Sequence, residues 1–136
     1  MNESKFPSPF YRVAAKAIIR NEEGEILLVK ERSDAWSIPG GGLDHGENLR
    51  EAIKREVKEE LGVNTTSIDE KPCFSFSALN TQFDVWCLAV CFDTKIAPDV
   101  QFLLSDGSTE AKYFSPEAIK HDIQLEEADA PLVHFI

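Results

Sequence analysis

The stretch that decides the fold covers residues 39–63 and reads PGGGLDHGENLREAIKREVKEELGV. Its first part is rich in glycine, which lets backbone atoms approach a ligand closely because no Cβ intrudes. Residues 48–61 contain neither Gly nor Pro, and their apolar residues recur at three- and four-residue steps. This period predicts an amphipathic helix. Gly62 is expected to end it, since glycine readily adopts the left-handed conformation of a helix C-terminus.

The predicted helix carries three glutamates on one edge. At 100° per residue, Glu56, Glu59 and Glu60 fall within about 100° of one another beside the apolar stripe. Clustered carboxylates repel one another, and a hard divalent cation such as Mg²⁺ would compensate for their charge. A metal beside a glycine-rich loop would assist the attack of water on a phosphoryl group. The structural alternative is a solvated acidic face that pairs with neighbouring Lys and Arg side chains.

The spacing of the whole stretch favours the metal site over that alternative. Gly41 is followed after five residues by Glu47, and after seven more by REVKEELGV at residues 55–63. This pattern resembles the complete signature of the Nudix hydrolases. The resemblance implies an α/β fold, the Nudix α/β/α sandwich with a mixed sheet and a loop–helix–loop catalytic motif. It also implies metal-dependent hydrolysis of a pyrophosphate bond in a nucleoside diphosphate linked to another group, X.

The resemblance also assigns roles within the signature. It implies that Mg²⁺ (or Mn²⁺) is held by three glutamate side chains and one backbone carbonyl, those of Glu56, Glu59, Glu60 and Gly40. Glu56 or one of its neighbours is expected to help activate water. Arg55 is expected to hold a catalytic glutamate in place, since a guanidinium stays protonated and cannot act as a base. Glu47 is expected to make a supporting contact across the loop.

Several candidates lie outside the helix. The expected substrate contacts are one glycine and two cations: Gly41, Lys30 and Arg32. A further metal ligand is sought on a later loop, where Asp106 and Glu110 are the candidates. Trp36 is expected in the core rather than stacked on a base, and His45 is expected to be a solvated loop residue rather than a phosphate contact.

The remaining chain reads as strands, loops and two short helices. We expect a hairpin of residues 11–20 and 26–29 and a short extended piece at residues 36–38. Residues 83–92 alternate so that both faces of a central strand are covered. The other expected elements are strands at 68–79 and 109–114, a loop at 94–107, a helix capped by Ser115, and a terminal helix within 126–136.

The length and net charge of the chain limit the number of domains and the classes of partner. With 136 residues the chain is expected to form one domain over 1–136, with 1–9 as a lead-in and the signature at 41–63. Its net charge of −10 argues against nucleic acid and anionic membranes as partners. A small nucleotide is not excluded, because divalent cations would reverse the local field.

The compartment and assembly follow from similar arguments. The chain has no apolar run long enough to span a membrane and no apolar N-terminal signal, and its three cysteines have no C-x-x-C spacing. We therefore expect a cytoplasmic protein. The resemblance makes a homodimer the expected assembly.

The substrate is less constrained than the reaction. Signatures of NADH and coenzyme A enzymes are absent, and Ala78 and Leu79 stand where ADP-ribose enzymes tend to place proline. These absences favour a nucleoside triphosphate, oxidised or not, or a nucleotide-sugar. One alternative is a regulatory Nudix domain that binds nucleotide without turnover. Another is an acidic interaction module whose carboxylates only solvate a helix.

Overall fold

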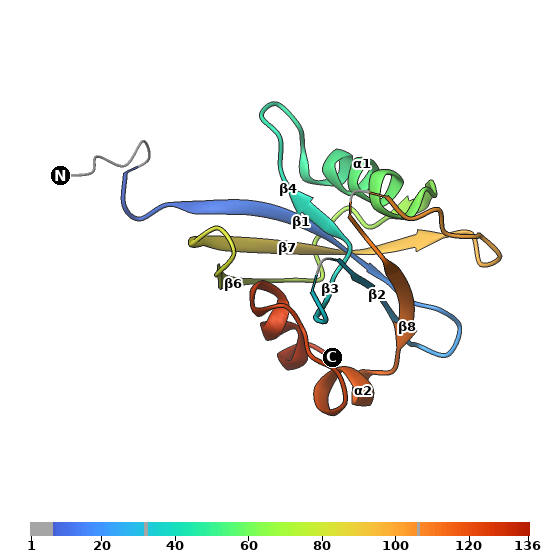
Figure 1. Cartoon of the computed structure of the whole chain (residues 1–136). Coiled ribbons are helices and arrows are strands. Elements are labelled where there is room, and N and C mark those ends of the chain that lie inside the picture. Colours follow the sequence, from blue (N-terminus) through green and yellow to red (C-terminus); the bar gives the residue numbers. More distant parts are fainter. Residues whose placement is uncertain (1–6, 32, 106) are drawn as a thin grey trace.

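The computed structural model describes residues 7–31, 33–105 and 107–136. In this part of the chain a run of strands precedes the first helix, and a second run of strands precedes the last two helices (Figure 1). Their bounds are β1 Tyr11–Ile19, β2 Ile26–Lys30, β3 Trp36–Ser37, β4 Gly40–Gly42, α1 Leu49–Leu61, β5 Thr65–Ile68, β6 Phe74–Asn80, β7 Val85–Ile96, β8 Glu110–Phe114, α2 Pro116–His121 and the 3₁₀ helix η1 Glu127–His134.

Two sheets lie between the helices. The larger sheet has the order β4-β1-β7-β5, with β6 also paired to β7, and the smaller has the order β3-β2-β8. Strands β1 and β7 run parallel while the other pairings are antiparallel, so the larger sheet is mixed. Helix α1 covers one side of the sheets, and α2 and η1 lie on the other (Figure 1). The expected α/β/α sandwich is confirmed.

Alternation along β1 and β2 builds a core on each side of the sheets. Ala15, Ala17 and Ile19 pack with the apolar stripe of α1, as do Leu27 and Val29. The intervening residues of both strands pack on the opposite side with α2 and η1: Ile18, Ile26 and Leu28. Successive side chains of a strand point to opposite faces, so odd positions of β1 face α1 and even positions face η1.

The predicted hairpin of the first two strands is wrong. Arg20 and Ile26 form an isolated bridge at the turn, but the strands then separate into different sheets. Strand β1 pairs instead with β4 and β7, and β2 pairs with β3 and β8. This arrangement buries the apolar residues on both faces of the two strands, because each strand lies between two helical layers.

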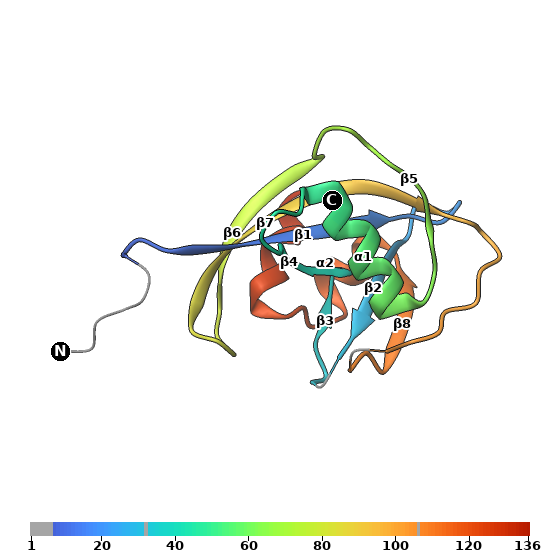
Figure 2. The same cartoon turned by 90° about the horizontal axis from the view of Figure 1, so that it is seen from above.

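Other boundaries also differ from the predictions. The glycines expected in a loop form strand β4, and the run expected at 68–79 divides into β5 and β6, which pair with successive parts of β7 (Figure 2). Strand β7 extends to Ile96, into the predicted loop. Its first half is not covered on both faces, since Trp86 is 49% exposed. The terminal helix is 3₁₀ and contains Pro131.

Both predicted helix starts and the end of α1 are confirmed. Asn48 accepts a hydrogen bond from the Glu51 N–H at 2.9 Å, and Gly62 follows the helix with φ of 70°. The Ser115 side chain caps α2, which begins with Pro at its first position. Among the described residues, no helix has the length and apolarity needed to cross a membrane.

Candidate active site

Arg55 lies at the centre of the acidic edge of α1. Its Nε and Nη2 donate to the two carboxylate oxygens of Glu47 at 2.8 and 2.9 Å. Its Nη1 donates to Glu56 at 2.8 Å and to Glu59 at 3.3 Å, and Nη2 also reaches the Gly42 carbonyl at 3.1 Å. Hydrogen bonding by Arg55 lowers the pKa of Glu47 to about 2. The guanidinium therefore joins the loop before α1 to two of the predicted metal ligands.

Glu60 occupies a different environment from the other two glutamates. Its residue is 4% exposed, and its Oε1 accepts a hydrogen bond from the Gly40 N–H at 3.1 Å. Its Oε2 is buried and has no hydrogen-bond partner among the described residues. Burial raises the pKa of Glu60 to about 8, although the positive charge of Lys16 opposes this shift. A buried carboxylate oxygen without a partner is a feature that a bound cation would satisfy.

The donor set fits a hard divalent cation, but the side chains are not gathered around one point. Carboxylate and carbonyl oxygens are the ligands that Mg²⁺ takes in proteins. In the part of the chain that is described, no three acidic, His or Cys side chains converge as a formed metal cluster. Glu56 and Glu59 contact Arg55 instead. Binding a cation would thus require these carboxylates to exchange partners.

Strand β4 brings backbone close to charged side chains on each of its faces. A Cβ at Gly41 would lie 2.7 Å from Glu56 Oε1, whereas a Cβ at Gly42 would lie 2.0 Å from Arg12 Nη2. Gly40 has φ of 138°, and a Cβ there would lie 2.1 Å from the Ala15 carbonyl oxygen. Gly40 therefore needs glycine because of its φ and the Ala15 backbone, whereas glycine at 41 and 42 leaves room for the ends of the Glu56 and Arg12 side chains.

A cavity of about 530 Å³ opens beside the glycine strand. It is lined by even positions of β1, by Gly41 and Gly42, by the first half of β7, and by Phe83 and Asp129. The β1 and β7 side chains that form its floor include small ones, Ala14, Cys87 and Ala89. Small side chains on adjacent strands leave this space unfilled. Its volume lies in the range of small-molecule sites, roughly 300–1,000 Å³.

Lys16 and Asp129 form a buried pair at the wall of this cavity. The Lys16 Nζ lies 3.7 Å from Asp129 Oδ1 and donates to the Ile38 carbonyl at 3.3 Å. Asp129 is 1% exposed, and its other oxygen accepts from the Ile38 N–H at 3.2 Å. Burial favours the neutral form of Lys16, but Asp129 and Glu60 outweigh it and raise the Lys16 pKa. Burial also raises the pKa of Asp129.

Comparison with known proteins agrees with the signature and the fold. Residues 10–135 match the NUDIX domain family. The chain belongs to the Nudix family. A MutT NUDIX hydrolase structure from Burkholderia pseudomallei superposes with a TM-score of 0.76 at 20% identity, covering 93% of this chain and 98% of the other. At this identity the likeness shows the fold alone.

The curated Nudix relatives match over a shorter stretch. A Bacillus subtilis protein, provisionally named 8-oxo-dGTP diphosphatase, is 46% identical over 55 residues, or 40% of this chain and 37% of its own length. An RNA pyrophosphohydrolase of Ruthia magnifica subsp. Calyptogena magnifica is 38% identical over 55 residues, or 40% of this chain and 31% of its own length. The matched region thus spans about a third of these relatives. Nudix hydrolases generally use divalent metal ions and act on small nucleotides.

The predicted substrate cation Lys30 lies away from the Nudix helix. Its Nζ is 3.9 Å from Glu110 Oε2 and 5.1 Å from the centre of the Trp36 ring. Lys30 does not line the cavity beside β4. Glu110, a candidate for an additional metal ligand, is engaged by the same ion pair. The structure therefore brings these two residues to each other rather than to the glutamates of α1.

Two candidates, Arg32 and Asp106, lie outside the described residues. The segment before Asp106 nevertheless runs along the end of α1. The Leu103 N–H donates to the Leu61 carbonyl at 2.9 Å, and the Ser105 N–H donates to that of Glu60 at 3.3 Å. This later loop therefore reaches the neighbourhood of the Nudix glutamates.

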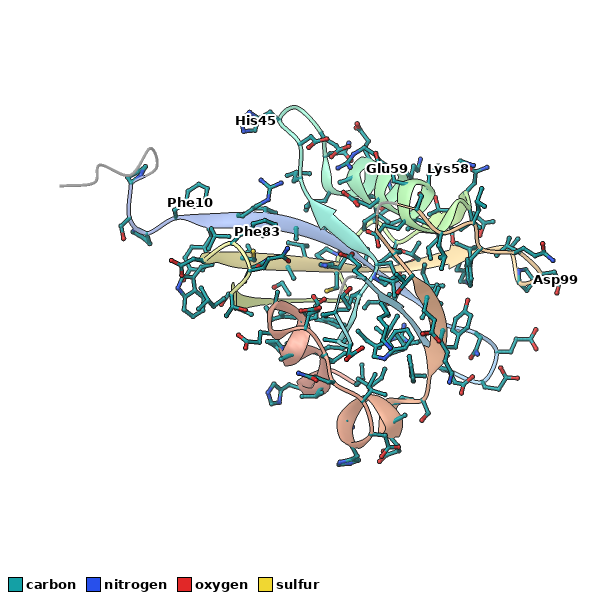
Figure 3. The ribbon with its side chains drawn as sticks, in the orientation of Figure 1. Phe10, His45, Lys58, Glu59, Phe83 and Asp99 are labelled. Atoms are coloured by element: carbon teal, nitrogen blue, oxygen red, sulfur yellow. The ribbon has the colours of Figure 1, made fainter. Side chains whose placement is uncertain are left out.

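The core position predicted for Trp36 and the exposed loop position predicted for His45 are confirmed, whereas Phe83 and Trp86 are exposed rather than in the core. Trp36 is 7% exposed and packs edge-on against Phe114, with ring centres 4.7 Å apart. His45 lies at the tip of the loop between β4 and α1, directed away from the sheets (Figure 3). Glu59 is exposed and lies on the outer side of α1 (Figure 3).

Sequence reasoning missed the residues of the cavity, above all Arg12, Lys16, Phe83 and Asp129. The first two carry a signal in retrospect. Both are charged and lie at even positions of a strand that is otherwise mostly apolar, so they share one face of that strand. Phe83 and Asp129 carry no comparable pattern. Phe83 belongs to the turn between β6 and β7 and Asp129 belongs to η1, and both line the cavity.

Proposed function

We propose that this Nudix protein hydrolyses a pyrophosphate bond in a nucleoside diphosphate linked to X, with Mg²⁺ (or Mn²⁺) as cofactor. The favoured substrate is a nucleoside triphosphate, oxidised or not, or a nucleotide-sugar. The observation that carries the proposal is that Gly41 and Gly42 line the cavity while Gly41 also abuts Glu56 of α1. Strand β4 therefore lies between the cavity and the acidic helix, and a ligand that lies along this strand is next to both.

In this proposal the metal is held by Glu56, Glu59, Glu60 and the Gly40 carbonyl. When bound, the cation polarises phosphoryl oxygens and lowers the pKa of water. Glu56 or one of its neighbours accepts the proton of the attacking water. The absence of a Cβ at Gly41 lets the diphosphate lie against the backbone beside Glu56, and this assigns Gly41 to substrate binding.

Arg55 and Glu47 act as positioning residues in the same proposal. Arg55 contacts both Glu56 and Glu59, so it restricts where these carboxylates can move. Glu47 binds Arg55 through two hydrogen bonds and accepts a third, from the Asp44 N–H at 3.1 Å. Two parallel charge-assisted hydrogen bonds fix the plane of a guanidinium. Lys30 and Arg32 remain proposed phosphate contacts. Lys30 would have to break its ion pair with Glu110 to contact a phosphate.

The negative charge of the protein favours small nucleotides over long nucleic acids as substrates. The chain has a net charge of −10, and residues 69–136 alone carry 12 acidic and 4 basic residues. A polyanion that extends over this surface is repelled. We therefore favour small nucleotides over RNA, although some curated relatives are named RNA pyrophosphohydrolases. We place the protein in the cytoplasm, where its three free cysteines would stay reduced.

The test is a panel of nucleoside triphosphates including 8-oxo-dGTP, nucleotide-sugars, ADP-ribose and RNA with a 5′-triphosphate. Each is incubated with the protein and Mg²⁺, and phosphate is measured after coupling to a phosphatase. Turnover that the double variant Glu59→Gln/Glu60→Gln lacks supports the proposal. Binding without turnover supports a regulatory nucleotide-binding domain instead. Absence of both overturns the proposal and supports an acidic interaction module.

A further inference from the structure

We propose that Arg12 binds a phosphate group of the substrate on the cavity side of β4, opposite the side that faces the glutamate helix. This proposal rests on the proposed function for the nature of the substrate. It assigns a substrate-binding role to a residue outside the Nudix signature. Its basis is the position of Arg12, its lack of a partner and the glycine at position 42.

The position of Arg12 follows from the register of β1. Arg12 pairs with Cys87 of β7, and Ala14 pairs with Gly42 of β4. As an even position, Arg12 points to the same side of the sheet as Ala14 and Lys16, and all three line the cavity. Its guanidinium lies directly on Gly42, because a Cβ there would be 2.0 Å from Nη2. Glycine at this position therefore makes room for the Arg12 side chain.

Among the cations near the cavity, Arg12 differs from Lys16 and Arg55 because its N–H donors are not used by other described residues. Lys16 is engaged by Asp129 and the Ile38 carbonyl, and Arg55 is engaged by Glu47 and its neighbours. Arg12 is exposed, and no hydrogen bond or ion pair links its side chain to another described residue. A guanidinium offers five N–H donors in a planar fork that suits phosphate oxygens.

The two faces of β4 define how a diphosphate would lie. Gly41 faces Glu56 and Gly42 faces Arg12, and both glycines line the cavity. Consecutive Cα atoms are about 3.8 Å apart. A diphosphate along the glycine strand therefore reaches the acidic helix with one phosphate and Arg12 with the other. This arrangement balances the charge of the phosphate that is more distant from the metal ligands.

Binding of inorganic pyrophosphate in the presence of Mg²⁺, measured by calorimetry, tests the proposal without turnover. We expect Arg12→Ala to weaken binding by roughly 10- to 100-fold, the effect of a charge-assisted hydrogen bond. Arg12→Lys should restore part of this loss, since it keeps the charge but not the fork. Lys71→Ala is the matched control, because it removes one positive charge from an exposed loop that does not line the cavity.

Gly42→Ala supplies a second test of the same contact. The new methyl group must displace the Arg12 guanidinium, which is the end of a flexible side chain, so the fold should be retained. We expect Gly42→Ala to weaken pyrophosphate binding, and the double variant Arg12→Ala/Gly42→Ala to bind as Arg12→Ala does. Effects that do not add identify two changes acting through one interaction. Circular dichroism and thermal unfolding of each variant verify folding.

Kinetics with a substrate from the panel provide an independent readout. We expect Arg12→Ala to raise KM by about 10-fold or more and to change kcat less. The proposal is overturned if Arg12→Ala binds pyrophosphate as tightly as Lys71→Ala, or if the unaltered protein does not bind it. If no nucleotide is hydrolysed but pyrophosphate binding still depends on Arg12, the proposed function fails while the anion site stands.

Discussion

Arg55 and Glu47 form a two-pronged ion pair, with Nε and Nη2 at 2.8 and 2.9 Å from the two carboxylate oxygens. The pair closes the loop between β4 and α1, and the third nitrogen of Arg55 contacts Glu56 and Glu59. One guanidinium thus connects the loop to the proposed metal ligands, and several consequences can be measured.

Replacing Arg55 by Lys should impair activity more than charge conservation suggests. Lysine has a single ammonium group and cannot bind both oxygens of Glu47 while also reaching Glu56. We expect kcat/KM to fall about 10- to 100-fold, the usual effect of losing a residue that orients metal ligands. Steady-state kinetics measures this, with Arg50→Lys on α1 as the control. Equal kcat/KM values for the two variants would show that Arg55 does not position the metal ligands.

Changing Glu59 and Glu60 to Gln should abolish metal binding as well as activity. An amide is uncharged and a poorer ligand for a hard cation than a carboxylate. We expect turnover to fall by more than about 100-fold, and the affinity for Mn²⁺, followed by electron paramagnetic resonance, to fall in parallel. Glu51→Gln, at an exposed position of the same helix, serves as the control. Retained Mn²⁺ binding by the double variant would contradict the proposed ligand set.

The buried Glu60 should make stability depend on pH when no metal is present. Its pKa is near 4.5 in the unfolded chain and about 8 in the folded protein, because burial penalises the charged form. Between these values the folded state binds more protons than the unfolded state, so this carboxyl lowers stability as the pH rises from about 4.5 to about 8.

Urea unfolding in EDTA at pH 5 and pH 8.5 measures the contribution of Glu60. In the Glu60→Gln variant the free energy of unfolding should fall less between these two pH values. This variant should also be more stable than the unaltered protein at pH 8.5. In the control variant Glu70→Gln, which changes an exposed residue, the free energy of unfolding should fall as much as in the unaltered protein. An identical pH profile for the Glu60→Gln variant and the unaltered protein would show that Glu60 does not titrate in this range.

Two glycines of β4 should respond differently to alanine. At Gly40 the methyl group would meet the Ala15 backbone, and φ of 138° is strained for alanine, so we expect a loss of about 2 kcal/mol or more in stability. At Gly41 the methyl group would meet the end of the Glu56 side chain, which can move. We therefore expect Gly41→Ala to keep its unfolding midpoint but to lose activity. Denaturant unfolding together with kinetics separates the two cases, and equal loss of stability would contradict this assignment.

The helix and its acidic edge could be predicted because their determinants are local. The apolar period, the Asn48 cap and Gly62 lie within one short stretch, and so does the spacing that identifies the family. The pairing of β1 was not predictable in the same way. A turn sequence between two apolar runs favours a hairpin, but competition from β4 and β7 is decided by contacts that are distant in the chain.

The sequence by itself therefore determined the helix, the candidate metal ligands and the reaction class they suggest. Only the tertiary structure decided which residues share the cavity. Arg12 and Lys16 reach it through the register of β1, and Asp129 reaches it through the docking of η1 near the other end of the chain. The physical reason is that helical periodicity acts over a few residues, whereas strand register and layer packing depend on the whole chain.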